Sequence, residues 1–209
     1  MSFEFGPVAA CTVLLGLWMT GLTQLPSKLM LYALQTVTLG LLAIWVGKQH
    51  GEPALVAAGT AVALLKGVAV PVYLNRVVRR LGCRRDEGLL LAPPLLLFAT
   101  AGALGALMLL HPFSRQIAPS ALPTIGMLFI GMVLMVSRRL AVSQIIGFLV
   151  LENGIFFYTI AQPHSMPPVV ELGVLMDILA GTMLAGLLTF RIRDSFEHID
   201  VTELKQLRG

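Results

Sequence analysis

Long apolar stretches separated by short polar breaks run along the whole chain. A helix that crosses a hydrocarbon core about 30 Å thick needs roughly 20 apolar residues, and seven stretches approach that length. They are residues 7–25, 28–47, 53–75, 89–110, 119–136, 140–161 and 168–190. The breaks contain proline, glycine or charged residues, which favour turns. The pattern predicts an all-α polytopic membrane protein with seven transmembrane helices.

The composition supports a membrane protein. Apolar residues make up 56% of the 209 residues, and the mean hydropathy is +0.84. Charged residues make up 12%, whereas a soluble domain has about 25%. So few charges exclude a water-soluble enzyme, a disordered chain and a nucleic-acid-binding domain. The two cysteines, Cys11 and Cys83, form no CxxC pattern and indicate neither a disulfide framework nor a metal site.

The basic residues are sorted by side. Twelve of the 15 lie in the breaks after the first, third and fifth stretches or in the C-terminal tail, and two lie on the opposite side. This bias predicts that the richer side is cytoplasmic. We expect the N-terminus outside and the C-terminus in the cytoplasm, which requires an odd number of spans. The first stretch has no positively charged segment before it, so we expect a retained helix and no signal peptide.

The order of polar residues indicates a repeat. Spans 28–47 and 140–161 carry polar residues midway, and spans 53–75 and 168–190 each carry one ionisable residue midway and end in basic residues. Both triplets of spans begin on the outer side, so the repeat is parallel, whereas many transporters contain inverted repeats. We expect one transmembrane domain over residues 1–193, with repeat A at 7–78, a connector helix at 89–110 and repeat B at 119–193, and then a cytoplasmic tail at 194–209.

Three ionisable residues lie inside predicted spans. They are Lys66, Glu152 and Asp177. A charge near the bilayer centre costs at least about 2.5–3.5 kcal/mol on insertion scales, so such residues are rare and usually functional. At about 1.5 Å per residue, all three fall in the middle third of the bilayer. Because they share one depth on different helices, they predict a lateral proton path in the membrane plane.

Neighbouring polar side chains support such a path. We expect Asn153, Gln35, Gln144 and Tyr158, with Thr36 and Thr38, to hold water between the ionisable groups. Buried carboxylates and lysines titrate nearer neutrality than exposed ones, which suits proton transfer. In the alternative interpretation, Lys66 pairs with Glu152 or Asp177 as a structural ion pair that joins helices.

Other features indicate packing or no chemistry. Small residues four apart in span 89–110, Ala99 with Ala103 and Gly102 with Ala106, predict a close helix contact. The sequence has no P-loop, GxGxxG, nucleophile elbow or metal-binding motif. We therefore expect no catalytic residues, no metal site and no cofactor in this chain.

The C-terminal third resembles a known family. The segments 138–140 and 144–154, which contain Leu151-Glu152-Asn153-Gly154, resemble the membrane component E of hydrogenase 4 (the HyfE family), as do Glu171-Leu172-Gly173 before Asp177 and the ending 198–209. The N-terminal half agrees more loosely through Gln35 and the stretch 66–71. That family is related to the K subunit of bacterial complex I (NuoK) and to the MrpC subunit of Mrp-type antiporters. Spans five to seven resemble the three-helix plan of those subunits.

The resemblance implies a proton-conducting membrane-arm subunit of a multisubunit redox complex, of the hydrogenase 4, formate hydrogenlyase or complex I type. Catalysis and metal clusters then belong to other subunits. The implied partners are antiporter-like subunits and a subunit like the H subunit of complex I. The implied location is the cytoplasmic (inner) membrane of a bacterium or archaeon. Two alternatives stay open: a structural scaffold subunit, or a stand-alone small ion transporter.

Overall fold

The computed structural model describes residues 6–82, 84–86, 91–110 and 121–161, and within these ranges the chain is all-α. The helices are α1 (Gly6–Gly21), α2 (Leu25–His50), α3 (Pro53–Ala61), α4 (Val70–Leu81), α5 (Pro93–Leu110), α6 (Ala121–Ser137) and α7 (Ala141–Ala161). A π-helical segment, η1 (Val62–Ala69), joins α3 to α4. The expected seventh span, 168–190, and the tail, 194–209, lie outside the described residues.

Six of the expected spans correspond to helices, with shifted boundaries. Within the described residues, Leu25–His50, Pro53–Arg80 and Ala141–Ala161 are long and apolar enough to cross a membrane, and α1, α5 and α6 are shorter apolar helices. Helix α5, which corresponds to the expected fourth span, begins at Pro93 instead of residue 89. Proline is favoured at the first position of a helix, because its missing N–H has no helical partner there.

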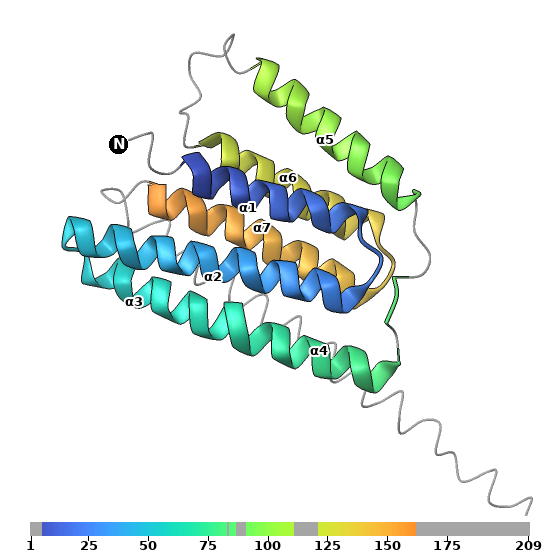
Figure 1. The fold of residues 1–209 in the computed structure, drawn as a ribbon, viewed down its shortest axis with the longest axis horizontal. Helices are drawn as coiled ribbons and strands as arrows, with labels where there is room; N and C mark the ends of the chain where they lie inside the picture. The colour runs from blue at the N-terminus through green and yellow to red at the C-terminus, as the bar shows by residue number, and fades with distance from the viewer. Residues whose placement is uncertain (1–5, 83, 87–90, 111–120, 162–209) are drawn as a thin grey trace, which may run out of the picture.

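The helices form a bundle in which α2 and α7 are central. Helix α7 lies between α2 and α6, while the α3–η1–α4 rod packs along the far side of α2 (Figure 1). The first apolar cluster includes Leu29 and Tyr32 of α2 with Ile146 and Leu149 of α7. The polar residues near the middle of these two helices, among them Gln35, Thr36, Glu152 and Asn153, are buried, which positions the candidate site.

Glycines allow two pairs of helices to touch through their backbones. A Cβ on Gly59 of α3 would lie 2.7 Å from the Gly40 carbonyl oxygen of α2, and one on Gly131 of α6 would lie 2.7 Å from the Gly147 carbonyl oxygen of α7. Small residues commonly allow such close approach between transmembrane helices. These contacts fix α3 against α2 and α7 against α6.

Helix α5 packs on α1 at the edge of the bundle (Figure 1), and the close contact expected of its small residues is absent among the described residues. Ala99, Gly102, Ala103 and Ala106 are exposed, and a Cβ on Gly102 would meet no atom within 4 Å. The helix instead turns Leu96, Thr100 and Leu104 inward. Within the described residues, the face with the four-residue spacing therefore meets no other helix.

Candidate functional site

Lys66 and Glu152 form an ion pair in the middle of the bundle. The Lys66 Nζ atom lies 2.9 Å from Glu152 Oε2, and the side chains are 13% and 2% exposed. Lys66 belongs to η1 and Glu152 to α7, so 86 residues of sequence separate two groups in contact. The structure therefore brings together two of the three ionisable residues that the sequence places at mid-membrane depth.

The π-helical segment places Lys66. Pro71 has no N–H, and its ring would press against the carbonyl of residue 67, four positions earlier. Just before it the helix widens, so that the Val70 N–H bonds to the Leu65 carbonyl, five residues back. Such π turns occur often at functional sites. Gly67 lets the widened turn reach α2, since a Cβ there would lie 2.7 Å from Val37 Cγ2.

Tight packing of α7 places Glu152. The Gly131–Gly147 contact holds α7 against α6, and a Cβ on Gly154 would lie 3.0 Å from Met127 Cβ. Between these glycines, Glu152 and Asn153 are buried within the bundle. A buried carboxylate is costly unless it is paired, so the contact with Lys66 is a condition for this packing.

A hydrogen-bond network continues from the residue next to Glu152. Asn153 Nδ2 donates to Gln35 Oε1 at 3.1 Å and lies 2.8 Å from Thr36 Oγ1. Gln35 Nε2 donates to the Thr12 carbonyl at 2.8 Å. Asn153, Gln35 and Thr36 are fully buried. Polar groups from α7, α2 and α1 thus meet at one level beside the ion pair.

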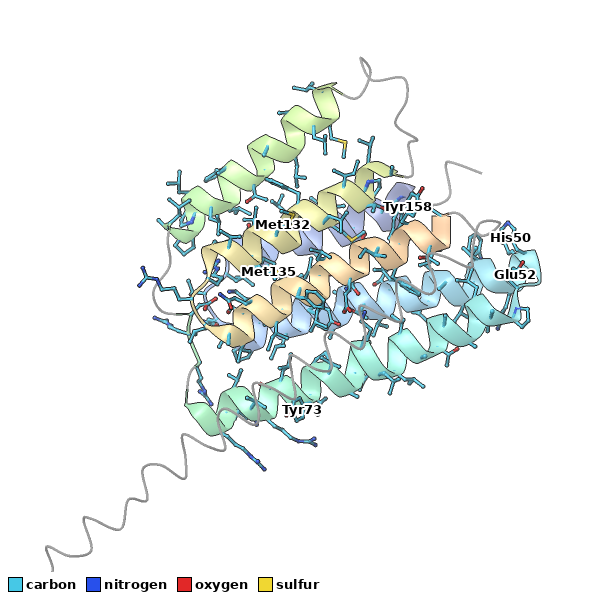
Figure 2. All side chains as sticks on the ribbon, turned by 180° about the vertical axis from the view of Figure 1, so that it is seen from behind. His50, Glu52, Tyr73, Met132, Met135 and Tyr158 are labelled. Carbon is cyan, nitrogen blue, oxygen red and sulfur yellow. The ribbon has the colours of Figure 1, made fainter. Side chains whose placement is uncertain are left out.

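The remaining predicted site residues lie elsewhere. Gln144 Nε2 donates to the Arg138 carbonyl at 3.0 Å, near the start of α7. Tyr158 lies near the opposite end of α7, towards the end of the bundle where His50 and Glu52 lie (Figure 2). Thr38 is not buried and bonds within its own helix to the Leu34 carbonyl. Asp177 lies outside the described residues.

A second buried charge cluster occupies the start of α2 and α7. The Asp86 carboxylate forms an ion pair with Lys28 of α2 and accepts a hydrogen bond from Ser143 Oγ at 2.6 Å. The Arg138 guanidinium lies 3.7 Å from Asp86 Oδ2, the carboxylate oxygen that also contacts Lys28 and Ser143, and it donates to the Thr20 carbonyl. All four side chains are buried.

Sequence reasoning missed this cluster. It treated Lys28 and Arg138 as loop cations that report orientation, but both are buried. The available signal was Asp86, an acid at the end of a segment rich in arginine. The basic residues that the sequence assigns to one side, from Lys28 to Arg138, do gather at one end of the bundle. Their orientation relative to the membrane stays a prediction.

Backbone bonds hold Asp86 in place. The Asp86 N–H donates to the Thr23 carbonyl at 2.8 Å, and the Leu25 N–H donates to the Arg84 carbonyl at 3.1 Å. Burial lowers the pKa of the Arg138 guanidinium, which lies between α6 and α7, and the Asp86 carboxylate opposes that shift. Arginine nevertheless stays protonated in proteins, so Arg138 keeps a positive charge beside the Asp86 carboxylate.

The two clusters differ in the chemistry they allow. Proton transfer from Lys66 to Glu152 leaves two neutral groups, whereas the same transfer from Lys28 to Asp86 would leave the Arg138 guanidinium charged and without a carboxylate. Among the described residues, no group of three or more His, Cys, Asp or Glu side chains is arranged to hold a metal ion. Cys11 is exposed, and Cys83 lies outside the described residues. The mid-bundle pair is therefore the candidate functional site.

Comparisons with known proteins identify relatives. No family model matches the chain, and no solved structure matches it. It is 24% identical over 151 residues to hydrogenase-4 component E of Escherichia coli and of Shigella flexneri, covering 70% of this chain and 70% of the relative. It is 32% identical over 184 residues to the uncharacterized protein Rv0085 of Mycobacterium tuberculosis, covering 85% of this chain and 84% of that protein. The chain therefore belongs to the same family as Rv0085.

Proposed function

We propose that this protein is a membrane subunit of a multisubunit hydrogenase complex. Two findings support this: the distant similarity to hydrogenase-4 component E and the set of long apolar helices. In this role the chain is a multi-pass protein of the inner membrane, and its partners are antiporter-like subunits and a subunit like the H subunit of complex I. Purification from native membranes tests this proposal, because a stand-alone transporter would purify without partner subunits.

Within such a complex, we infer that the chain passes protons laterally. The observation that carries this inference is the Lys66–Glu152 ion pair, at 2.9 Å and almost enclosed. A charge buried at mid-membrane is rare and by default functional. Protonation of Glu152 by Lys66 neutralises both groups at once, so the pair exchanges a proton without leaving a buried net charge.

The adjoining network gives the path a direction. The Asn153 bonds link α7 to Gln35 and Thr36 of α2, and Gln35 continues to the Thr12 carbonyl of α1. Asn153 Oδ1 is buried and accepts no hydrogen bond from a described residue. Amides do not carry protons at neutral pH, so transfer along this segment requires water molecules held by these groups. We place Asp177 as the next titratable group, on the predicted seventh span.

The proposal also includes the predicted topology. Seven spans, a cytoplasmic C-terminus and two diverged repeats place Lys66 and Asp177 at equivalent positions of the two halves. In the same scheme, spans five to seven correspond to the K subunit of complex I and to the MrpC subunit of Mrp antiporters. A reporter inserted in the loop after α4, at the basic end of the bundle, tests the orientation, because the reporter is expected to lie in the cytoplasm.

Replacing Glu152 with glutamine tests the relay. Glutamine has nearly the same shape but cannot take up a proton. The complex should assemble, and redox-driven proton uptake into inverted membrane vesicles should be lost. Glu52→Gln is the matched control, since Glu52 is a partly exposed acid at the turn between α2 and α3. Normal proton uptake by Glu152→Gln would remove the main support for the relay.

A scaffold role is the second candidate, and the same ion pair favours it. Lys66 and Glu152 join η1 to α7. In the scaffold interpretation, this buried pair holds the two helices in register and transfers no proton. Under this interpretation Glu152→Gln lowers the yield of intact complex on native gels, while proton uptake per assembled complex stays normal. Measuring both quantities on one preparation separates the two candidates.

A further inference from the structure

A basic pocket lies at the end of the bundle that holds Asp86. It has a volume of about 390 Å³ and lies between the start of α2, the end of α4 and the segment after it. Arg79, Arg84 and Arg85 line it, together with the amides of Gln24 and Asn75 and with Val78 as an apolar wall. The relay proposed above uses none of these residues.

The fold holds these arginines at fixed places. Helix α4 ends at Gly82, whose left-handed conformation (φ 67°) turns the chain back towards α2. An isolated antiparallel bridge then joins Arg85 to Gln24. Because the bridge and its neighbouring bonds use only backbone atoms, the guanidinium groups of Arg84 and Arg85 are not needed to fix the loop.

The pocket carries uncompensated positive charge. Among the described residues, its lining contains three guanidinium groups and no carboxylate. The nearby Asp86 carboxylate is already bound by Lys28, Arg138 and Ser143. Asn75 adds a buried carbonyl oxygen with no hydrogen-bond partner among the described residues. The site therefore offers several N–H donors, and one acceptor, to a group that brings negative charge and a hydroxyl.

A phosphate group fits this chemistry. Arginine forms bidentate, charge-assisted hydrogen bonds with phosphate oxygens. The location favours a lipid as the source, because basic pockets between transmembrane helices on the cytoplasmic side bind anionic headgroups. Val78 and Pro26 provide apolar surface beside the arginines, where the glycerol and first acyl carbons of a lipid would lie. We propose that this pocket binds the headgroup of an anionic phospholipid with free hydroxyls, such as phosphatidylglycerol.

Lipid binding to the purified full-length chain tests the proposal. Phosphatidylglycerol is titrated into detergent-solubilised protein and the bound lipid is counted by native mass spectrometry, with phosphatidylcholine as the neutral lipid. The Arg84→Gln/Arg85→Gln variant removes two pocket charges. The Arg76→Gln/Arg80→Gln variant is the matched control, since both arginines lie on α4 but do not line the pocket. Circular dichroism verifies that both variants fold.

Wild type and the control should bind phosphatidylglycerol equally, and the pocket variant roughly 30-fold more weakly, because two arginine contacts are lost. Equal weakening in both variants would show only a general attraction to surface charge and would overturn the proposal. Displacement of the lipid by inorganic phosphate at the same concentration would identify a free-anion site instead. Unchanged lipid binding by the pocket variant, with loss of a co-purifying protein, would identify a protein contact instead.

Discussion

The mid-bundle pair and the cluster around Asp86 are both buried ion pairs, but they are built differently. The Asp86 carboxylate contacts two cations and a hydroxyl from three separate segments, and backbone hydrogen bonds hold Asp86 in place. Glu152 pairs with Lys66, which is 13% exposed on a widened turn. The first arrangement joins the start of α2 to the start of α7 through Asp86, and its Arg138 stays charged. In the second arrangement, a proton can move from the lysine to the carboxylate and back.

The comparison indicates a division of labour between stability and transfer. A buried carboxylate with two cationic partners is costly to neutralise, because both cations then stay buried without compensation. A lysine–glutamate ion pair has a neutral alternative state, in which the proton has moved from the lysine to the carboxylate. Replacements in the Asp86 cluster should therefore act mainly on stability, and replacements of Lys66 or Glu152 mainly on proton transfer.

The largest loss of stability is expected for Asp86→Asn. It leaves the buried Lys28 and Arg138 without their carboxylate, and removing one partner of a buried pair costs about 3–5 kcal/mol. The melting temperature of the purified chain and the yield of complex should both fall. Glu52→Gln, at the other end of the bundle (Figure 2), should change stability by no more than about 0.5 kcal/mol, as surface replacements usually do. Equal stability of the two variants would contradict the anchoring role.

Gly131→Ala should have the next largest effect. The added methyl would meet the Gly147 carbonyl oxygen at 2.7 Å and Leu151 N at 2.8 Å, and overpacking costs about 1–3 kcal/mol. Since the affected backbone adjoins Glu152, proton uptake should fall too. Gly102→Ala on α5 has open space around it and should stabilise the helix by roughly 0.5–1 kcal/mol. Thermal unfolding in detergent measures both, and a stable, active Gly131→Ala would show that the α6–α7 contact is loose.

Asn153→Ala should cost less stability but impair transfer. Its amide contacts Gln35 and Thr36, and hydrogen bonds between transmembrane helices are worth about 0.6 kcal/mol on average. Proton uptake should nevertheless drop, because the network then ends at α7. Thr38→Ala, whose hydroxyl bonds within its own helix, is the control for loss of a polar group on α2. Full proton uptake by Asn153→Ala would exclude the network from the path.

The double replacement Lys66→Met/Glu152→Leu should cost no stability. Exchanging a whole buried ion pair for apolar residues is often neutral or even stabilising by about 1–4 kcal/mol. The complex should assemble in normal yield and translocate no protons. Normal translocation by the double variant would show that the pair serves packing alone. A single replacement cannot show this, because it also leaves one buried charge without its partner.

Sequence periodicity predicted the helices well because apolar runs of this length have few other stable forms. It also predicted that Lys66 and Glu152 share one depth, since depth follows from position along a helix. It did not predict which residues touch. The burial of Lys28 and Arg138 depends on the path of the loop ending at Asp86, and the π turn at Lys66 depends on Pro71 and on the approach of α2. Such features arise from tertiary contacts, which a helical pattern does not contain.

The dependence on tertiary contacts also explains why Gln144 lies away from the ion pair and why the small residues of α5 meet no described helix. Gln144 lies on α7 with Glu152 but two turns away, at the α6–α7 turn, where it bonds the Arg138 carbonyl. The small residues Ala99 and Ala103 share a face of α5, but that face is exposed. Spacing identifies residues on one face of a helix, and only packing decides what that face meets.

Infrared difference spectroscopy of the assembled complex during turnover tests the central claim most directly, because it observes the protonation of carboxyl groups. The account predicts a protonated carboxylic acid band that appears during turnover in wild type and in Glu52→Gln, and that is missing in Glu152→Gln. A wild-type complex that translocates protons while Glu152 stays ionised throughout would contradict it.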